Sequence, residues 1–360
     1  MYKSARHIGS IFRKTRPIHL TFFVTKRCNS RCPFCFYLRS TENEANITDE
    51  LSLDEVGHIS RSLGTLLWLA FSGGEIFLRD DLVEISKLFY KNNKPFIMLY
   101  PTNALLPEHI THVTEQILRY CRKSIITVKL SIDGLHETHD DLRQTPGSFE
   151  KTIKTYDSLG PLLDKYSHFE LGVNTVFCSR NQDSMDEIID FVRGMKNIKT
   201  HTISLVRGNL SDATFHDVDE KKYLRAIERL EENLKNRRSR LYRFKGARIK
   251  AAQDILQRRL IHQTMHHKKR LIPCYAGQLN LVLRESGDVY PCEMLTESLG
   301  NVRDHDYDMI KVVNSEKAAS IMNAIRNQTC FCTHECYFMT NILFNPRLYP
   351  GLAKEYVRLT

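Results

Sequence analysis

The sequence lacks any segment that would carry it into or across a membrane. No run of apolar residues approaches the about 18–20 that a membrane-spanning helix needs. The N-terminus, MYKSARHIGS, lacks the apolar stretch of a secretory signal peptide. We therefore expect a cytoplasmic protein, a compartment in which structural disulfides are disfavoured.

Acidic residues are scarce in two stretches. Residues 235–270 carry thirteen Lys or Arg against the single acid Asp254, and residues 1–16 carry five basic residues and no acid. Such surfaces can meet nucleic acid, an anionic membrane or an acidic substrate, or can simply be solvated helical faces. The chain also lacks a nucleic-acid motif with interleaved aromatic residues, so nucleic acid is an unlikely partner.

What the chain does contain is a regular alternation of apolar runs and amphipathic helices over residues 17 to about 209. Strict alternation predicts parallel strands with right-handed helical connections, that is, an α/β fold. Six such units are too few for a closed eight-fold barrel and predict a partial, open (β/α)6 TIM-like barrel. Strands are expected at 19–25, 66–71, 95–100, 125–132, 169–177 and 202–206, and helices at 52–62, 81–91, 107–121, 148–166, from 184, and at 315–326.

Two of these helices begin with a capping-box pattern, at Ser52 and Ser184, because each serine has a glutamate three residues later. Outside the barrel the composition changes, and we expect five segments. They are a basic N-terminal segment (1–16), the barrel core (17–210), a basic helical linker (211–270), a small cysteine-rich domain (271–345) and a C-terminal tail (346–360).

The cysteines fall into two groups. Cys28, Cys32 and Cys35 follow the first strand in a C-x3-C-x2-C spacing, and five more lie near the end of the chain: Cys274, Cys292, Cys330, Cys332 and Cys336. Cysteine clusters in a cytosolic chain indicate metal, and thiolate-rich sites favour iron–sulfur clusters or zinc. At this point a zinc knuckle or three buried thiols remain alternatives for the first group. The two isolated cysteines, Cys121 and Cys178, are expected to be buried apolar residues.

In parallel α/β barrels, chemistry gathers at the carboxyl ends of the strands. Those ends here carry Gly73-Gly74-Glu75, Asn103, Ser131 with Asp133, Asn174, and Val206. Two glycines let a backbone approach a ligand closely, and a following carboxylate can accept hydrogen bonds from an ammonium group.

Together, the cysteine loop and the ordered strand-end residues resemble the radical S-adenosylmethionine (SAM) superfamily over about residues 17–209. The resemblance implies a [4Fe-4S] cluster on Cys28, Cys32 and Cys35, with an open iron that binds SAM. It implies reductive cleavage of SAM to a 5′-deoxyadenosyl radical, which abstracts hydrogen from a substrate. One departure is Ile76, where many relatives have proline.

The same resemblance implies a set of SAM contacts. Glu75 with the two glycines would contact the methionine amine, and Arg143 the carboxylate. The remaining contacts would be Phe34 near the adenine, Asn103, Ser131 and Asp133 at the ribose, and Asn174 and Val206 at the adenosyl group.

The second cysteine group resembles the SPASM and twitch extensions of radical SAM enzymes. Gly287 to Cys292 predicts a tight hairpin that presents a thiolate. The complete SPASM pattern has seven cysteines and this chain has five, so we expect one auxiliary [4Fe-4S] cluster. Its ligands would be Cys274, Cys292, Cys336 and one of Cys330 or Cys332; a second, incomplete site using His334 and a structural zinc site are the alternatives.

Two functions follow from these patterns. The first is a radical SAM enzyme, an oxidoreductase or modifying enzyme, acting on a peptide or small molecule, with electrons from a flavodoxin or ferredoxin. The second is a non-catalytic, metal-stabilised binding module that docks on RNA or an anionic membrane through its basic linker.

Overall fold

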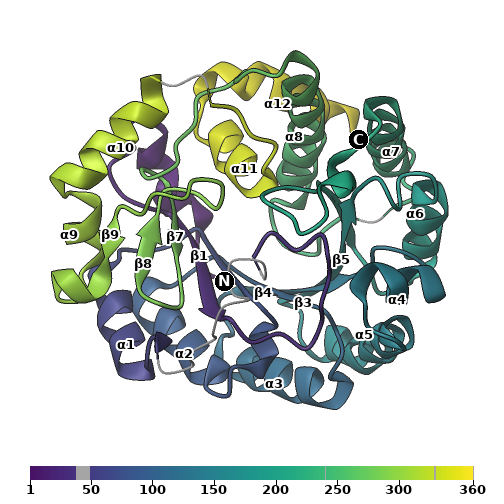
Figure 1. The fold of residues 1–360 in the computed structure, drawn as a ribbon, viewed down its shortest axis with the longest axis horizontal. Coiled ribbons are helices and arrows are strands. Elements are labelled where there is room, and N and C mark those ends of the chain that lie inside the picture. Colours follow the sequence, from purple (N-terminus) through teal and green to yellow (C-terminus); the bar gives the residue numbers. More distant parts are fainter. Residues whose placement is uncertain (38–48, 240, 328–329, 360) are drawn as a thin grey trace.

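A computed structural model gives the structure of residues 1–37, 49–239, 241–327 and 330–359. Its centre is a curved nine-stranded sheet in the order β6-β5-β4-β3-β2-β1-β7-β8-β9, so the sheet has two edges and is not a closed barrel. Figure 1 looks along the barrel, with helices arranged in a ring around the strands. The open barrel that the alternation predicts is therefore confirmed.

The first six strands are parallel and follow one another in sequence order. β2 and β3 each begin two residues later than their apolar runs. Leu66 and Leu67, which precede β2, are nevertheless buried, as their apolar character predicts. The strands are β1 (His19–Thr25), β2 (Trp68–Gly73), β3 (Ile97–Thr102), β4 (Ile125–Ser131), β5 (Phe169–Phe177) and β6 (Thr200–Leu205).

Helices connect these strands on the outside of the sheet, where their apolar faces form the main core with the strands. The short helix α4 and the 3-10 turns were not anticipated from the sequence. The elements are α1 (Leu53–Ser62), α2 (Leu82–Asn93), α3 (Pro107–Tyr120), α4 (Glu137–Arg143), α5 (Ser148–Lys165), α6 (Met185–Gly194) and α7 (Glu220–Lys235), with η1 (Ser4–Ile11), η4 (Ile76–Leu78) and η5 (Ala213–His216).

The two capping-box predictions have different outcomes. Ser52 accepts a hydrogen bond from the backbone N–H of Glu55, and Glu55 accepts one from the backbone N–H of Ser52, so this box is confirmed. The box at Ser184 is wrong: the serine precedes α6, but its side chain caps nothing. Ser184 has φ −95° and ψ 8°, whereas a capping serine needs the extended backbone that Ser52 has (φ −69°, ψ 163°).

The cysteine-rich region continues the barrel sheet. β7 pairs with β1 in parallel, and β8 forms the predicted hairpin with β7. The sequence did not predict that this hairpin would join the barrel. The elements after α7 are α8 (Ala247–His267), β7 (Asn280–Leu283), β8 (Asp288–Tyr290), β9 (Gly300–Asn301), η6 (Val302–His305), α9 (Met309–Val313), α10 (Glu316–Asn327), α11 (Glu335–Leu343), η7 (Pro346–Leu348) and α12 (Tyr349–Arg358).

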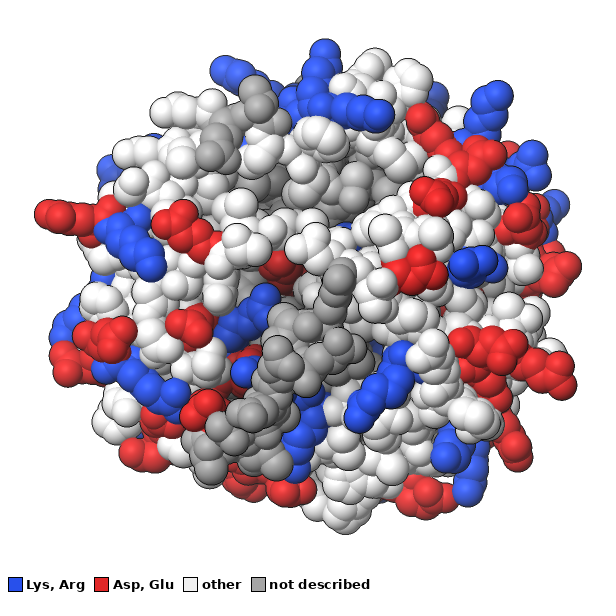
Figure 2. Space-filling view, viewed as in Figure 1, with Lys and Arg blue, Asp and Glu red and all other residues white. Residues whose placement is uncertain are grey.

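Helix α8, in the basic segment, is part of the body of the protein. Ala252, Ile255 and Ile261 are fully buried, and the helix contacts α7, α11 and α12. Together α8 and α11 occupy the side of the barrel that the strands leave open (Figure 1). On the face shown in Figure 2, basic and acidic side chains are interspersed around the rim. None of the described helices is long and apolar enough to span a membrane.

Candidate active site

The front cysteine loop is joined to the neighbouring strand end by backbone hydrogen bonds. Gly74 N–H donates to the carbonyl of Thr25 (2.9 Å), and Glu75 N–H donates to that of Arg27 (2.8 Å). A Cβ at Gly74 would lie 2.0 Å from the Arg27 oxygen, and one at Gly73 2.4 Å from the Thr25 oxygen. The glycines are therefore required because two segments of this chain approach closely.

A buried arginine supports the base of the same loop. Arg79 donates to the carbonyls of Val24 (3.1 Å) and Leu51 (2.6 Å) and pairs with Glu50 at 3.3 Å. Glu50 also accepts a hydrogen bond from the Thr25 hydroxyl at 2.6 Å. These contacts fix the end of β1, so the cysteine loop starts from a rigid point.

The three front thiols lie on this loop near other buried polar groups. Cys35 N–H donates to the Cys32 carbonyl (3.1 Å), and the Ser30 hydroxyl lies 3.2 Å from the Cys32 sulfur. The amide nitrogen of Asn103 lies 3.8 Å from the Cys28 sulfur. Burial raises the pKa of Cys28 to about 11, so its thiolate needs a positive partner, and a bound iron–sulfur cluster supplies one.

Glu75 is buried next to this loop with both carboxylate oxygens in contact with protein donors. One oxygen accepts from the Thr102 hydroxyl (2.9 Å) and Phe77 N–H (3.2 Å), and the other from Asn103 N–H (2.7 Å). Burial raises its pKa to about 7 despite these hydrogen bonds. A cationic ligand nearby would favour the ionised form.

Asp133 and Arg143 form a buried ion pair. Arg143 donates to one carboxylate oxygen through two nitrogens, at 2.9 and 2.7 Å, and Val176 N–H donates to the other at 2.7 Å. The Arg143 carbonyl in turn accepts from the Ser30 hydroxyl at 3.2 Å. Asp133 thus holds Arg143 against the cysteine loop, and both its oxygens are already engaged.

The other predicted contact residues face one cavity of about 310 Å³ inside the barrel. Phe34 also packs on Phe215, with ring centroids 5.8 Å apart. Ser131 donates to the Thr102 carbonyl at 3.0 Å. The predicted residues that line the cavity are Phe34, Ser131, Asn174 and Val206.

Several residues that line the cavity are not among the predicted site residues. Lys129 of β4 and Trp68 of β2 point into the barrel, and Lys250 and Asp254 of α8 line the same space. Thr127, Lys129 and Ser131 alternate with apolar residues, a period-two pattern that predicts one polar face of a strand. That pattern was available in the sequence.

The back cysteines converge from three separate segments. Cys274, Cys292, Cys330 and Cys332 all line one small cavity of about 80 Å³, whereas Cys336 lines the barrel cavity. Burial raises the pKa of Cys292 to about 12 and that of Cys332 to about 11. As at the front loop, thiolates here need a nearby positive charge, which the iron ions of a cluster would supply.

A buried polar network lies between the two cysteine groups. Arg207, after β6, pairs with Glu293 at 3.0 Å and with Glu335 at 3.5 Å. His334 Nε2 lies 2.8 Å from Glu293, and its Nδ1 accepts from Cys336 N–H at 3.3 Å. Both ring nitrogens of His334 therefore face protein groups. Among the described residues, no three His, Cys, Asp or Glu side chains gather around a single-ion position.

Two family models match the chain, each over one of the two cysteine groups. Residues 22–192 match the model of the Radical SAM superfamily, and residues 274–337 match the SPASM iron–sulfur cluster-binding domain. The chain carries a radical SAM domain followed by a SPASM domain. The resemblance inferred from the cysteine spacings is thus confirmed.

Characterised relatives of the chain are distant. It is 25% identical over 305 residues to the AdoMet-dependent heme synthase of Methanosarcina barkeri, covering 81% of both chains. It is 26% identical over 297 residues to the subtilosin biosynthesis protein AlbA of Bacillus subtilis, covering 82% of this chain and 59% of AlbA.

Solved structures show the same fold. Streptococcus suis SuiB bound to S-adenosylmethionine has a TM-score of 0.60 and 16% identity, over 88% of this chain and 71% of SuiB. The structure of anSMEcpe with bound AdoMet has a TM-score of 0.60 and 17% identity, over 95% and 98% of the two chains. The radical SAM and SPASM domains imply a [4Fe-4S] cluster with SAM and auxiliary iron–sulfur binding.

Proposed function

We propose that this protein uses SAM at the front cysteine loop to abstract hydrogen from a peptide or small molecule held in the barrel cavity. The observation that carries the proposal is spatial. Four residues line one cavity inside the barrel: Phe34 of the front loop, Ser131 at the end of β4, Asn174 paired with it on β5, and Val206 directly after β6. Cys28, Cys32 and Cys35 would hold the cluster, which would supply the single electron for reductive cleavage of SAM to methionine and a 5′-deoxyadenosyl radical.

The chain's own residues would hold SAM at this edge. Cys28, Cys32 and Cys35 supply three thiolates for the cluster, and Arg143, held by Asp133, supplies a positive charge beside the loop. Glu75 is a carboxylate whose pKa is close to neutrality, so an ammonium group beside it would stabilise its charged form.

The back cysteines would hold one auxiliary cluster. The four thiols that share a cavity, Cys274, Cys292, Cys330 and Cys332, would reach it most directly, and Cys336 lies on the barrel side. This favours both Cys330 and Cys332 as ligands, whereas the resemblance to SPASM and twitch extensions implies only one of them, together with Cys336. Arg270 already contacts the Cys330 sulfur at 2.7 Å.

Two substrate classes, a peptide and a small molecule, have support among the similar proteins. AlbA, the subtilosin biosynthesis protein, and SuiB, whose structure with the precursor peptide SuiA matches with a TM-score of 0.61, favour a peptide, whereas the heme synthase favours a small molecule. A flavodoxin or ferredoxin would supply the electron.

The test is anaerobic reconstitution with iron and sulfide, followed by addition of dithionite and SAM. The proposal predicts iron in both sites and formation of 5′-deoxyadenosine. Zinc in place of iron, together with no 5′-deoxyadenosine, would favour the non-catalytic binding module. That alternative already has less support, because α8 of the basic segment is built into the barrel wall.

A further inference from the structure

The interior face of β4 carries a single charged side chain, Lys129. It lies between Thr127 and Ser131 on the face that lines the barrel cavity. Because Ser131 is the last residue of β4 and Lys129 comes two residues earlier, Lys129 lies about 7 Å deeper in the barrel. It is therefore below the edge at which SAM would bind.

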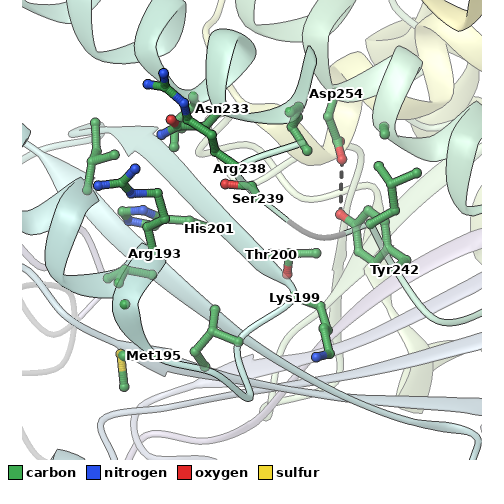
Figure 3. Close-up of a pocket in the computed structure, with 18 of the residues that line it drawn as sticks. Arg193, Met195, Lys199, Thr200, His201, Asn233, Arg238, Ser239, Tyr242 and Asp254 are labelled. Atoms are coloured by element: carbon green, nitrogen blue, oxygen red, sulfur yellow. Dashed lines mark hydrogen bonds between the residues drawn. The ribbon is translucent and has the colours of Figure 1, made fainter. Parts of the chain in front are cut away.

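Lys129 has no acidic partner among the described residues. Its ammonium donates a hydrogen bond to the hydroxyl of Thr202 on β6. Asp254 of α8 is occupied by Lys250 and by the Tyr242 hydroxyl at 3.0 Å, the contact drawn as a dashed line in Figure 3. Burial lowers the pKa of Lys129 to about 8; the nearby charge of Lys250 adds to this effect, and that of Asp254 opposes it. An anion here would be stabilised in a site poor in water.

At the other polar end of the cavity, two carboxylates face two basic side chains, and His334 Nε2 lies 2.8 Å from Glu293. Arg207 is shared there by two carboxylates, Glu293 and Glu335, and one Glu335 oxygen has no hydrogen-bond partner among the described residues. Between the ends the lining is mainly apolar and includes Phe36, Leu99, Phe244 and Met339. Among the described charged side chains that line the cavity, Lys129 is the one without an oppositely charged partner. An anionic group would therefore be attracted to Lys129, so the cavity would bind such a substrate in one direction.

We propose that the barrel cavity binds a substrate with an apolar body and a carboxylate, and that Lys129 pairs with that carboxylate. Lys129 then acts as a positioning residue that sets which substrate carbon faces the front cysteine loop. This inference rests on the proposed function for its mechanistic meaning, but the binding itself can be measured separately. A small organic acid and an acidic peptide side chain offer the same chemistry.

Trp68 makes the binding measurable without turnover. It is the only tryptophan in the chain and lines the same cavity, and its indole N–H has no hydrogen-bond partner among the described residues. The reconstituted protein is titrated with 3-phenylpropionate and with its neutral amide, following Trp68 fluorescence and, independently, heat of binding. A second arm uses a capped tripeptide with glutamate between two phenylalanines, and its glutamine counterpart.

The expected result is that the acid of at least one pair binds about tenfold or more tightly than its neutral counterpart. Lys129→Met removes this ratio and Lys129→Arg retains it. Lys151→Met, at an exposed lysine of α5, leaves the ratio unchanged. A preference in the first pair points to a small acid, and one confined to the second points to a peptide.

Three results would overturn the inference: equal binding of acid and neutral probe, no binding of either acid at millimolar concentration, or a ratio that survives Lys129→Met in a folded protein. Formation of 5′-deoxyadenosine by the wild type is measured without probes. Its absence would count against the proposed radical SAM function, whereas the probe ratio tests only Lys129.

Discussion

The two cysteine groups are built in different ways. Cys28, Cys32 and Cys35 lie on one loop, which is fixed by hydrogen bonds to the adjacent strand end at Gly74 and Glu75. The back group is drawn together by the β7–β8 hairpin, the segment after α10, and the start of α11. The front thiols all lie within one short loop, whereas the back thiols come from separate segments, whose placement depends on the barrel sheet that β7 joins.

This difference predicts that the two sites can be lost separately. The front site should control SAM chemistry, and the back site should affect it only through the substrate. Two cysteine substitutions test this separation directly. Two further sets of substitutions test the ion pair that supports the front loop and the capping box of α1, and all are given from the largest expected effect to the smallest.

Cys28→Ser should abolish formation of 5′-deoxyadenosine, because the front loop would lose one of its three thiolate ligands. The measurement is anaerobic product analysis together with iron content. About four irons, those of the auxiliary cluster, should remain. The control is Cys178→Ala, at a buried cysteine outside both groups, which should keep the iron of both sites. Undiminished product from Cys28→Ser would place the SAM site elsewhere.

Cys292→Ser should have the converse effect. The protein should lose the auxiliary iron but still form 5′-deoxyadenosine from SAM in the absence of substrate, since the front loop makes its own supporting contacts. Iron analysis and product analysis check this outcome. If both clusters disappear together, the separation between the sites is wrong.

Arg143→Met tests the buried ion pair that supports the front loop. Asp133 would be left as an unpaired buried charge, which should lower the free energy of unfolding by about 3–5 kcal/mol. Denaturant unfolding provides the measurement. Lys154→Met, which breaks the exposed pair with Glu108, is the matched control and should lower the free energy of unfolding far less, because solvent screens that pair. Similar values for the two variants would contradict the assigned burial.

The smallest expected effect on the free energy of unfolding concerns Ser52 and Ser184, which share the sequence pattern of a capping box. Ser52→Ala should lower the free energy of unfolding by about 1 kcal/mol, because the capping box is formed. Ser184→Ala should change it very little, because the Ser184 side chain caps nothing. Equal losses from both substitutions would show that both boxes form in solution.

The serines also show how far the sequence could predict the structure. The pattern of a capping box is local, but its formation depends on the backbone angle at the serine, which differs between Ser52 and Ser184. The six strands and the front cysteine loop follow from local periodicity and spacing. The pairing of β7 with β1 joins residues far apart in sequence, so no local pattern predicts it.

The candidate site was predictable to a similar degree. Ser131 at the end of β4 and Val206 directly after β6 do face one cavity, as the position of strand ends predicts. The contribution of α8 could not be inferred, because its basic composition also fits a solvated helix. The position of Lys129 on the polar face of β4 could be predicted from the alternating pattern. Its place in a binding site could not, because a lysine in a strand is not by itself evidence of such a site.

The most direct test of the central claim, that the front loop holds the SAM-binding cluster, is electron paramagnetic resonance of the two reduced cysteine variants with and without SAM. In Cys292→Ser, which keeps only the front site, SAM should change the cluster spectrum. In Cys28→Ser, SAM should leave the remaining spectrum unchanged. An unchanged spectrum in Cys292→Ser, or a SAM-dependent change in Cys28→Ser, would contradict the account.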